Sequence, residues 1–266
     1  MPEFIRKTPI SLNISLPTGS VEVVAEERDT INVEVTPYGS SRQDREAAEA
    51  TAVILNGDEL TIEPPKGNSY LRSSVQLKIE IHAPIDSDVR VSVASATVSC
   101  KGRYHAVVVR TASGDVQIDN ATGDLKIQTA SGDVHINDIG GKFSGKTASG
   151  DIAANDVAGP TTLRSTSGNI DIASVRTDVR LKSASGVLKI GSSHTGVISA
   201  NSTSGKVSVG VLPGTGVWLD LDSVSGSINN RLDTSSSESD SAELTIQART
   251  TSGDIDILRA HERSIV

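Results

Sequence analysis

The chain has 266 residues, and only 2% of them are aromatic, with one Trp, two Phe and three Tyr beside 23 glycines. Its formal net charge is −8, from 33 acidic and 25 basic residues, which argues against a nucleic-acid partner, because such proteins carry a basic footprint. The single cysteine, Cys100, excludes an intrachain disulfide.

The N-terminal segment 1–7 carries positive charges with no apolar stretch behind them, so we do not expect a signal peptide. No run in the sequence approaches the roughly 18 apolar residues that a membrane span requires. We therefore expect a cytoplasmic protein with no membrane span.

Residues 1–93 are predicted to form an irregular β region that starts and caps the rest of the fold. Alternating apolar residues, separated by Gly, Pro, Asn and Asp turns, indicate strands in this region. The predicted strands are 10–14, 21–24, 31–35, 60–62 and 75–81. The stretch 41–50 is the one plausible helix, with a loop as the alternative.

Residues 94–266 carry an imperfect repeat, marked by a recurring Ser-Gly pair. The glycines of the first five pairs lie 18 residues apart, and the next three follow at spacings of 19, 21 and 27. They are Gly114, Gly132, Gly150, Gly168, Gly186, Gly205, Gly226 and Gly253. The flanks also repeat, as T-A-S-G-D-V-Q-I, T-A-S-G-D-V-H-I and T-T-S-G-D-I-D-I show.

Each repeat predicts one coil with two short strands and two glycine corners, where glycine accepts positive φ without a Cβ clash. Coils stacked roughly 4.8 Å apart would pair their backbones and bury a thin aliphatic core. The expected core column is Val116, Val134, Ile152, Ile170 and Leu188, the last after a one-residue shift. We therefore predict an all-β, single-chain β-solenoid with roughly 18-residue coils.

The spacing becomes irregular toward the C-terminus. The polar, acidic and Ser-rich stretch 234–241 lengthens the last interval and is predicted to be a surface loop, followed by a C-terminal cap. Trp218 falls where the spacing departs from 18. Because a lone Trp is usually largely buried, we expect it to fill a packing gap, with a binding hot spot as the alternative.

Several motifs besides the repeat occur in order along nearly the whole chain. They are L-P-T-G-S-V at 16–21, L-T-I-E-P-P at 60–65, G-T-G-V-W-L-D at 214–220 and S-V-S-G at 223–226. With these motifs and T-A-S-G-D-V, the sequence resembles the DUF4097 family, bacterial β-strand-repeat proteins often labelled adhesins. The resemblance implies a β-helix-like fold and no established activity, and the adhesin label itself rests on the fold.

No combination of acid, base and nucleophile is visible, so we expect no catalytic residues. The five histidines are scattered: His82, His105, His135, His194 and His261. Cys100 has no neighbouring base, and a lone thiol is more often a small buried hydrophobe. No phosphate loop is present, since G-T-G at 214–216 lacks a third glycine, and we expect no cofactor.

One acidic column is the candidate for a metal site, although we expect no metal. Asp115, Asp133 and Asp151 share a repeat position, and stacking would place their carboxylates about 5 Å apart, where a cation such as calcium would relieve the repulsion. In the alternative, each carboxylate accepts a hydrogen bond in its own turn while water screens the charges. The column ends at Asn169 and Val187.

A hydroxyl column accompanies the Ser-Gly pairs. Its members are Thr111, Thr129, Thr147, Ser165 and Ser183. Such arrays order water in ice-binding proteins, but small hydroxyl residues also fit a tight corner and bond neighbouring backbone groups. The adjacent glycines favour the structural role.

Three functions are compatible with these features. The leading one is a non-enzymatic, adhesin-like interaction or scaffold module that presents a flat solenoid face to a protein or surface partner. The second is a structural element that self-associates end to end, as bactofilin-type filaments do. The third, a carbohydrate-active β-helix enzyme, is disfavoured because the chain offers so few sugar-stacking aromatics.

Overall fold

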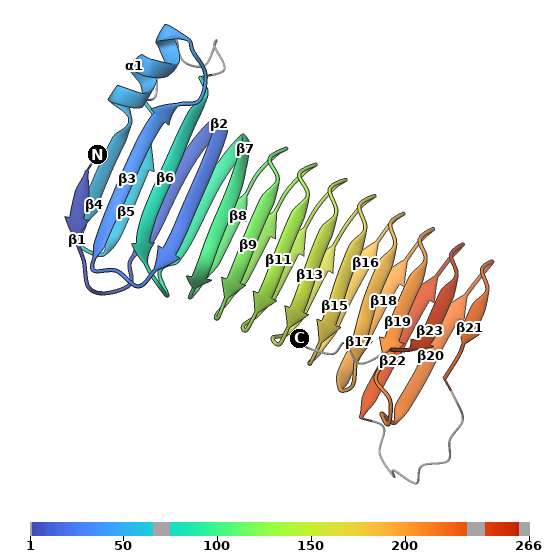
Figure 1. Ribbon diagram of the computed structural model, residues 1–266. Coiled ribbons are helices and arrows are strands. Elements are labelled where there is room, and N and C mark those ends of the chain that lie inside the picture. The colour runs from blue at the N-terminus through green and yellow to red at the C-terminus, as the bar shows by residue number, and fades with distance from the viewer. Residues whose placement is uncertain (1, 66–74, 233–242, 261–266) are drawn as a thin grey trace. The chain divides into compact units, whose positions relative to one another are not determined.

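The structure is a computed structural model that describes residues 2–65, 75–232 and 243–260 (Figure 1). The chain divides into two compact units, Met1–Ile136 and Asn137–Val266. Each unit is built almost entirely from β-strands, as the alternating apolar residues and the repeat predicted. The stretch 234–241, predicted to be a loop, lies outside the described residues.

Among its described residues, the first unit contains one helix and ten complete strands. They are β1 (Glu3–Ile5), β2 (Ser11–Glu26), β3 (Thr30–Pro37), α1 (Arg42–Ala50), β4 (Ala52–Asn56), β5 (Glu59–Glu63), β6 (Leu77–Pro84), β7 (Asp88–Tyr104), β8 (Val107–Arg110), β9 (Val116–Ala121) and β10 (Leu125–Gln128). Strand β11 (Val134–Ile139) contains the division between the units.

The irregular start of the solenoid mixes strand directions. Strand β3 pairs antiparallel with β1 and β6, and β4 pairs antiparallel with β5, whereas β7 pairs parallel with β2, β8 and β9. The predicted helix is confirmed as α1, which lies beside β3 and β6 (Figure 1). The division of the chain into an N-terminal capping region, 1–93, and a repeat region, 94–266, stays a prediction.

The sequence predicted two separate strands, 10–14 and 21–24. Instead, the Leu-Pro-Thr-Gly segment at 16–19 runs inside the single long strand β2. On one side β2 pairs with β5 over Ser11–Ile14 and with β6 over Gly19–Glu26. Within this strand Gly19 has a φ of +126°, in the region that favours glycine. A Cβ there would lie 1.9 Å from the Leu77 carbonyl oxygen, so only glycine fits.

The second unit consists of two rows of parallel strands. Row 1 contains β13 (Ile152–Val157), β15 (Ile170–Val175), β17 (Leu188–Ser193), β19 (Val207–Val211), β23 (Ile255–Arg259) and β21 (Ile228–Asn230). Row 2 contains β12 (Phe143–Lys146), β14 (Thr161–Arg164), β16 (Val179–Ser183), β18 (Gly196–Ser202), β22 (Leu244–Thr250) and β20 (Val217–Ser223). Successive strands of the chain alternate between the two rows, so that each coil contributes one strand to each row, which defines a β-solenoid.

The predicted core column is confirmed. Its members Val116, Val134, Ile152, Ile170 and Leu188 are all buried. The expected one-residue shift at Leu188 is wrong, because Leu188 pairs with Ile170 in register, at the same interval of 18 as the other members.

The hydroxyl column has the structural role that the adjacent glycines favoured. Thr129 Oγ1 accepts a hydrogen bond from the backbone N–H of Gly132 at 3.0 Å, and Ser183 Oγ accepts one from Gly186 at 2.9 Å. The hydroxyl thus satisfies a buried N–H at a corner where coils approach too closely for a side chain. A Cβ on Gly168 would lie only 2.0 Å from the Gly150 carbonyl oxygen.

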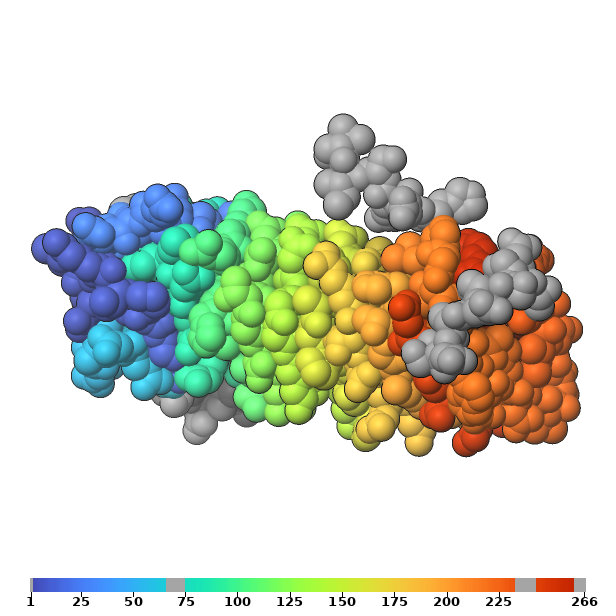
Figure 2. All heavy atoms as spheres, turned by 90° about the horizontal axis from the view of Figure 1, so that it is seen from below, coloured from blue at the N-terminus to red at the C-terminus, as the bar shows by residue number. Residues whose placement is uncertain are grey.

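The last coil of the chain is threaded between two earlier ones. Strand β22 lies between β18 and β20, and β23 lies between β19 and β21. In Figure 2 the red atoms of this coil accordingly emerge between two orange bands. The spatial order of the coils therefore departs from their order in the chain, and β20 and β21 form the end of the stack in the second unit.

Candidate functional site

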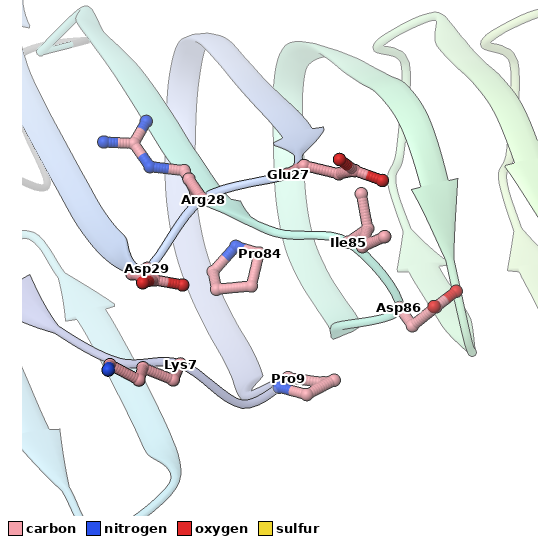
Figure 3. Close-up of a pocket in the computed structure, with 8 residues that line it drawn as sticks. All are labelled: Lys7, Pro9, Glu27, Arg28, Asp29, Pro84, Ile85 and Asp86. Atoms are coloured by element: carbon pink, nitrogen blue, oxygen red, sulfur yellow. The ribbon is translucent and has the colours of Figure 1, made fainter.

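The first unit has a hollow of about 720 Å³, lined by the loop before β2, the β2–β3 loop and the segment from β6 to β7 (Figure 3). Two of its charged groups, Arg28 and Asp86, are engaged with neighbouring side chains. The Arg28 guanidinium binds Glu26 Oε1 and Thr30 Oγ1, both at 2.9 Å, and Asp86 binds Arg103 at 2.7 and 2.8 Å. In Figure 3 the charged ends of Arg28 and Asp86 point away from one another. The hollow offers no convergent acid, base and nucleophile.

Cys100, the single thiol, is fully buried, as the sequence suggested. Burial raises the pKa of this thiol to about 12, and the negative charge of Asp119 acts in the same direction. The thiol therefore stays protonated and is a poor nucleophile at neutral pH.

The histidines are not brought together. His82 Nδ1 lies 3.0 Å from Glu26 Oε1 at the surface, while His105, His135 and His194 are exposed, and His261 lies outside the described residues. The absence of an enzymatic role stays a prediction.

The acidic column binds backbone rather than merely facing solvent. Asp115 Oδ1 accepts a hydrogen bond from the backbone N–H of Asp133 at 3.0 Å, and Asp151 Oδ1 accepts one from Asn169 at 2.7 Å. The column continues at Asn169, whose Oδ1 accepts from Val187 at 2.9 Å. These bonds reach the next coil, whereas the alternative to cation binding placed them within each residue's own turn.

Within the described ranges, no group of three or more His, Cys, Asp or Glu side chains is arranged to hold a metal ion. The hydrogen bonds give the column a structural role, because each one fixes the register of a neighbouring coil. The expectation that the protein holds no metal, with Asp115, Asp133 and Asp151 as the one candidate site, stays a prediction.

Trp218 is 52% exposed, so the expectation that it fills a packing gap is wrong. It lies in β20, where Val217, Leu219 and Leu221 point inward and the alternate residues point outward. The pattern V-W-L-D-L-D places Trp218 on the outward face with Asp220 and Asp222. That alternation was the signal in the sequence, and it outweighs the general tendency of tryptophan to be buried.

A cationic patch that sequence reasoning missed lies on row 2 of the second unit. It consists of Lys146, Arg164, Arg180 and Lys182, all exposed. Lys146, Arg164 and Lys182 occupy matching positions on three adjacent parallel strands, and Arg180 lies two residues before Lys182 on the same face. Neighbouring strands are about 4.8 Å apart, so like charges stand side by side.

The charges on row 1 of the same unit are arranged differently. Lys189 in β17 pairs with Asp171 at 2.7 Å. Lys206, just before β19, pairs with Asp256 at 2.5 Å, and Arg176, just after β15, pairs with Asp156. Among the described residues, no ion pair neutralises the four cations of the patch. Row 2 therefore concentrates positive charge on an otherwise acidic protein. The signal in the sequence was the spacing of 18 between residues 146, 164 and 182.

The stacked parallel coils define the protein as a β-solenoid. The chain belongs to the Toastrack DUF4097 family, whose sequence profile matches residues 10–258. This match confirms the resemblance and the fold class expected from it.

Three solved structures are similar to this chain at low identity. One, called a "putative cell adhesion protein", is from Clostridium sporogenes (11% identity, 97% of this chain and 99% of that chain, TM-score 0.24). A "putative lipid binding protein" from Parabacteroides distasonis aligns at 12% identity over 98% of this chain and 96% of that chain (TM-score 0.44). A "putative adhesin" from Parabacteroides merdae aligns at 12% identity over 98% and 95% (TM-score 0.35). No curated protein matches the sequence.

In the part of the chain that the structure describes, no helix has the length and apolar character needed to cross a membrane.

Proposed function

We propose that this protein is a non-enzymatic interaction module that binds an acidic partner, a protein or another surface, through the cationic patch of row 2. The observation that supports the proposal is the concentration of four unneutralised cations on one face, whereas Lys189, Lys206 and Arg176, in or beside row 1, are all paired with aspartates. Like charges on adjacent strands are destabilising. An anionic partner would relieve that repulsion, and the relief would contribute favourably to the free energy of binding.

The structural background suits a binding platform better than a reaction site. The strands of row 2 are fixed in register by parallel pairing, so the backbone positions that carry the cations form a fixed pattern. The patch lies on a row of flat strands, with small or charged outward residues such as Ser144 and Thr162 beside the cations. Electrostatic attraction of this kind favours fast association and declines as salt increases.

The test compares two triple variants with the same change in net charge. Lys146→Gln, Arg164→Gln and Lys182→Gln together remove the patch. In the matched control, Arg176→Gln, Lys189→Gln and Lys206→Gln remove three paired cations from the same unit. The probes are poly-L-glutamate, for an acidic protein, and vesicles containing phosphatidylglycerol, for an anionic surface, each titrated at low and high salt.

A cation near an anionic surface contributes about 1 kcal/mol. The patch variant should therefore bind at least one probe about a hundredfold more weakly at low salt, while the control binds like the unmodified protein. Equal losses in the two variants would reduce the effect to net charge and contradict the proposal. So would a failure of the unmodified protein to bind either probe.

A further inference from the structure

The end of the stack in the second unit leaves a strand edge open. Strand β20 pairs with β22, and β21 pairs with β23, and the described residues contain no strand on the outer edge of either. A β-strand bonds to neighbours on both sides, so the outer set of N–H and C=O groups of β20 is available to a further strand.

The aliphatic core also runs to this end without a polar cap. The inward residues Leu219 and Leu221 are half-buried, although their partners Ile246 and Ala248 in β22 are fully buried. Ile228 in β21 is 43% exposed, whereas its partner Ile255 is fully buried. A strand added to β20 would cover Leu219 and Leu221 as each inner coil covers the one before it.

The outward face of β20 determines the chemistry of such a strand. It presents Trp218, Asp220 and Asp222, of which Asp220 binds Arg249 at 3.1 Å and Asp222 is exposed. Side chains directly opposite on a neighbouring strand lie about 5 Å apart, and opposite charges there are stabilising. Basic side chains would thus complement the aspartates, and one of them could lie over the Trp218 ring.

We propose that the open edge of β20 binds an extended segment of a protein partner in which basic residues alternate with apolar ones. The apolar residues would cover Leu219 and Leu221, the basic ones would face Trp218, Asp220 and Asp222, and backbone hydrogen bonds would extend row 2 by one strand. This is strand addition to a sheet edge. It uses none of the cations of the patch, so it is independent of the function proposed above.

Charge favours this occupant over a second copy of the same edge. Two β20 strands placed side by side would bring their rows of aspartates together on one face. The whole chain adds to this repulsion, with a net charge of −8. A basic segment is attracted by both features.

The experiment uses the fluorescence of Trp218, the only tryptophan of the chain, which lies at the proposed edge. The probes are three blocked seven-residue peptides: one alternating Val and Lys, one alternating Val and Glu, and the Val/Lys peptide with a central proline. The Val/Lys peptide should change the Trp218 emission saturably and bind at least tenfold more tightly than the Val/Glu peptide. The proline peptide should bind weakly, because proline cannot donate to the edge.

Two charge-reversal variants complete the test. Asp222→Lys should reduce or reverse the preference for the Val/Lys peptide, whereas Asp138→Lys, an exposed position on β11, should leave it unchanged. Both variants are checked for folding by circular dichroism. Equal affinity for the three peptides, no binding at all, or equal effects of the two variants would overturn the proposal. A concentration-dependent dimer that excludes the Val/Lys peptide would instead identify a second copy as the occupant.

Discussion

The inside of each coil holds a thin layer of aliphatic side chains, and Val134 is fully buried in that layer. Val134→Asp would place an unpaired carboxylate in this aliphatic layer. Burial of an unpaired charge is among the few changes that destabilise a protein by more than about 4 kcal/mol. We expect the variant to be unfolded or to melt far below the unmodified protein in thermal circular dichroism. His135→Asp, one position along on the exposed face, should melt almost unchanged. Similar melting of the two variants would contradict the placement of Val134.

At the scale of residues, the repeat predicted the buried positions well and the surface poorly. Equal spacing fixes which residues stack, so the aliphatic column followed directly from the sequence. The cationic patch was missed, although the same spacing could have revealed it. Its members are far apart in the sequence, and only an alignment of the repeats brings residues 146, 164 and 182 together. The bonds of Asp115 to the next coil could not be predicted, because they depend on the distance between corners.

Helix α1 is held in place by Asp44, a buried carboxylate. Asp44 forms a capping box with Ser41, and its Oδ1 accepts a hydrogen bond from the backbone N–H of Gln76 at 2.9 Å. The bond from Gln76 is the main reason why the pKa of Asp44 is lowered, and the interaction with Ser41 adds to it. A carboxylate of this kind anchors the helix to the segment before β6.

A lowered pKa in the folded state means that this anchoring is fully present above the pKa of the unfolded chain, about 3.9, and is lost as the pH falls through the folded value. Asp44→Ala should lower stability by about 1 kcal/mol at neutral pH and speed amide exchange in α1. The deficit should shrink as the pH falls below about 4. Glu49→Ala, which removes an exposed carboxylate from the same helix, is the control. A deficit of Asp44→Ala that does not depend on pH would rule out this role for Asp44.

At the scale of elements, alternation predicted most strands but not their ends. The strands at 31–35, 60–62 and 75–81 appear within or overlapping β3, β5 and β6. Proline and glycine at 17 and 19 indicated a turn, yet β2 continues through them because β7 pairs with it along nearly its whole length. Strand β4 was missed, since its short run A-V-I-L-N does not alternate in polarity.

The threaded order of the last coils could not be predicted, because coils with the same repeat pattern can stack on one another in either order. Chain length supplies the physical reason in retrospect. Five residues, 212–216, link β19 to β20, whereas only 194–195 link β17 to β18. Three additional residues could span at most roughly 10 Å, which allows the chain to pass one extra level of about 4.8 Å and leave space for β22.

Engineered disulfides would test this order, because the two possible arrangements place different residues side by side. In the threaded order, Asn201 is the neighbour of Arg249, and Asp222 lies one strand beyond. Adjacent parallel strands bring Cα atoms within the roughly 4.4–6.8 Å that a disulfide requires, whereas residues two strands apart are about 9.6 Å apart. Asn201→Cys with Arg249→Cys should therefore form a bond under mild oxidation.

The matched pair, Asn201→Cys with Asp222→Cys, should stay reduced, since the threaded coil separates the two positions. Cys100 is buried and needs no replacement. Mass spectrometry of unreduced peptides would distinguish the products. If the second pair cross-links and the first does not, then the coils stack in chain order, β20 no longer ends the stack, and the strand edge proposed to bind a basic segment is closed by β22.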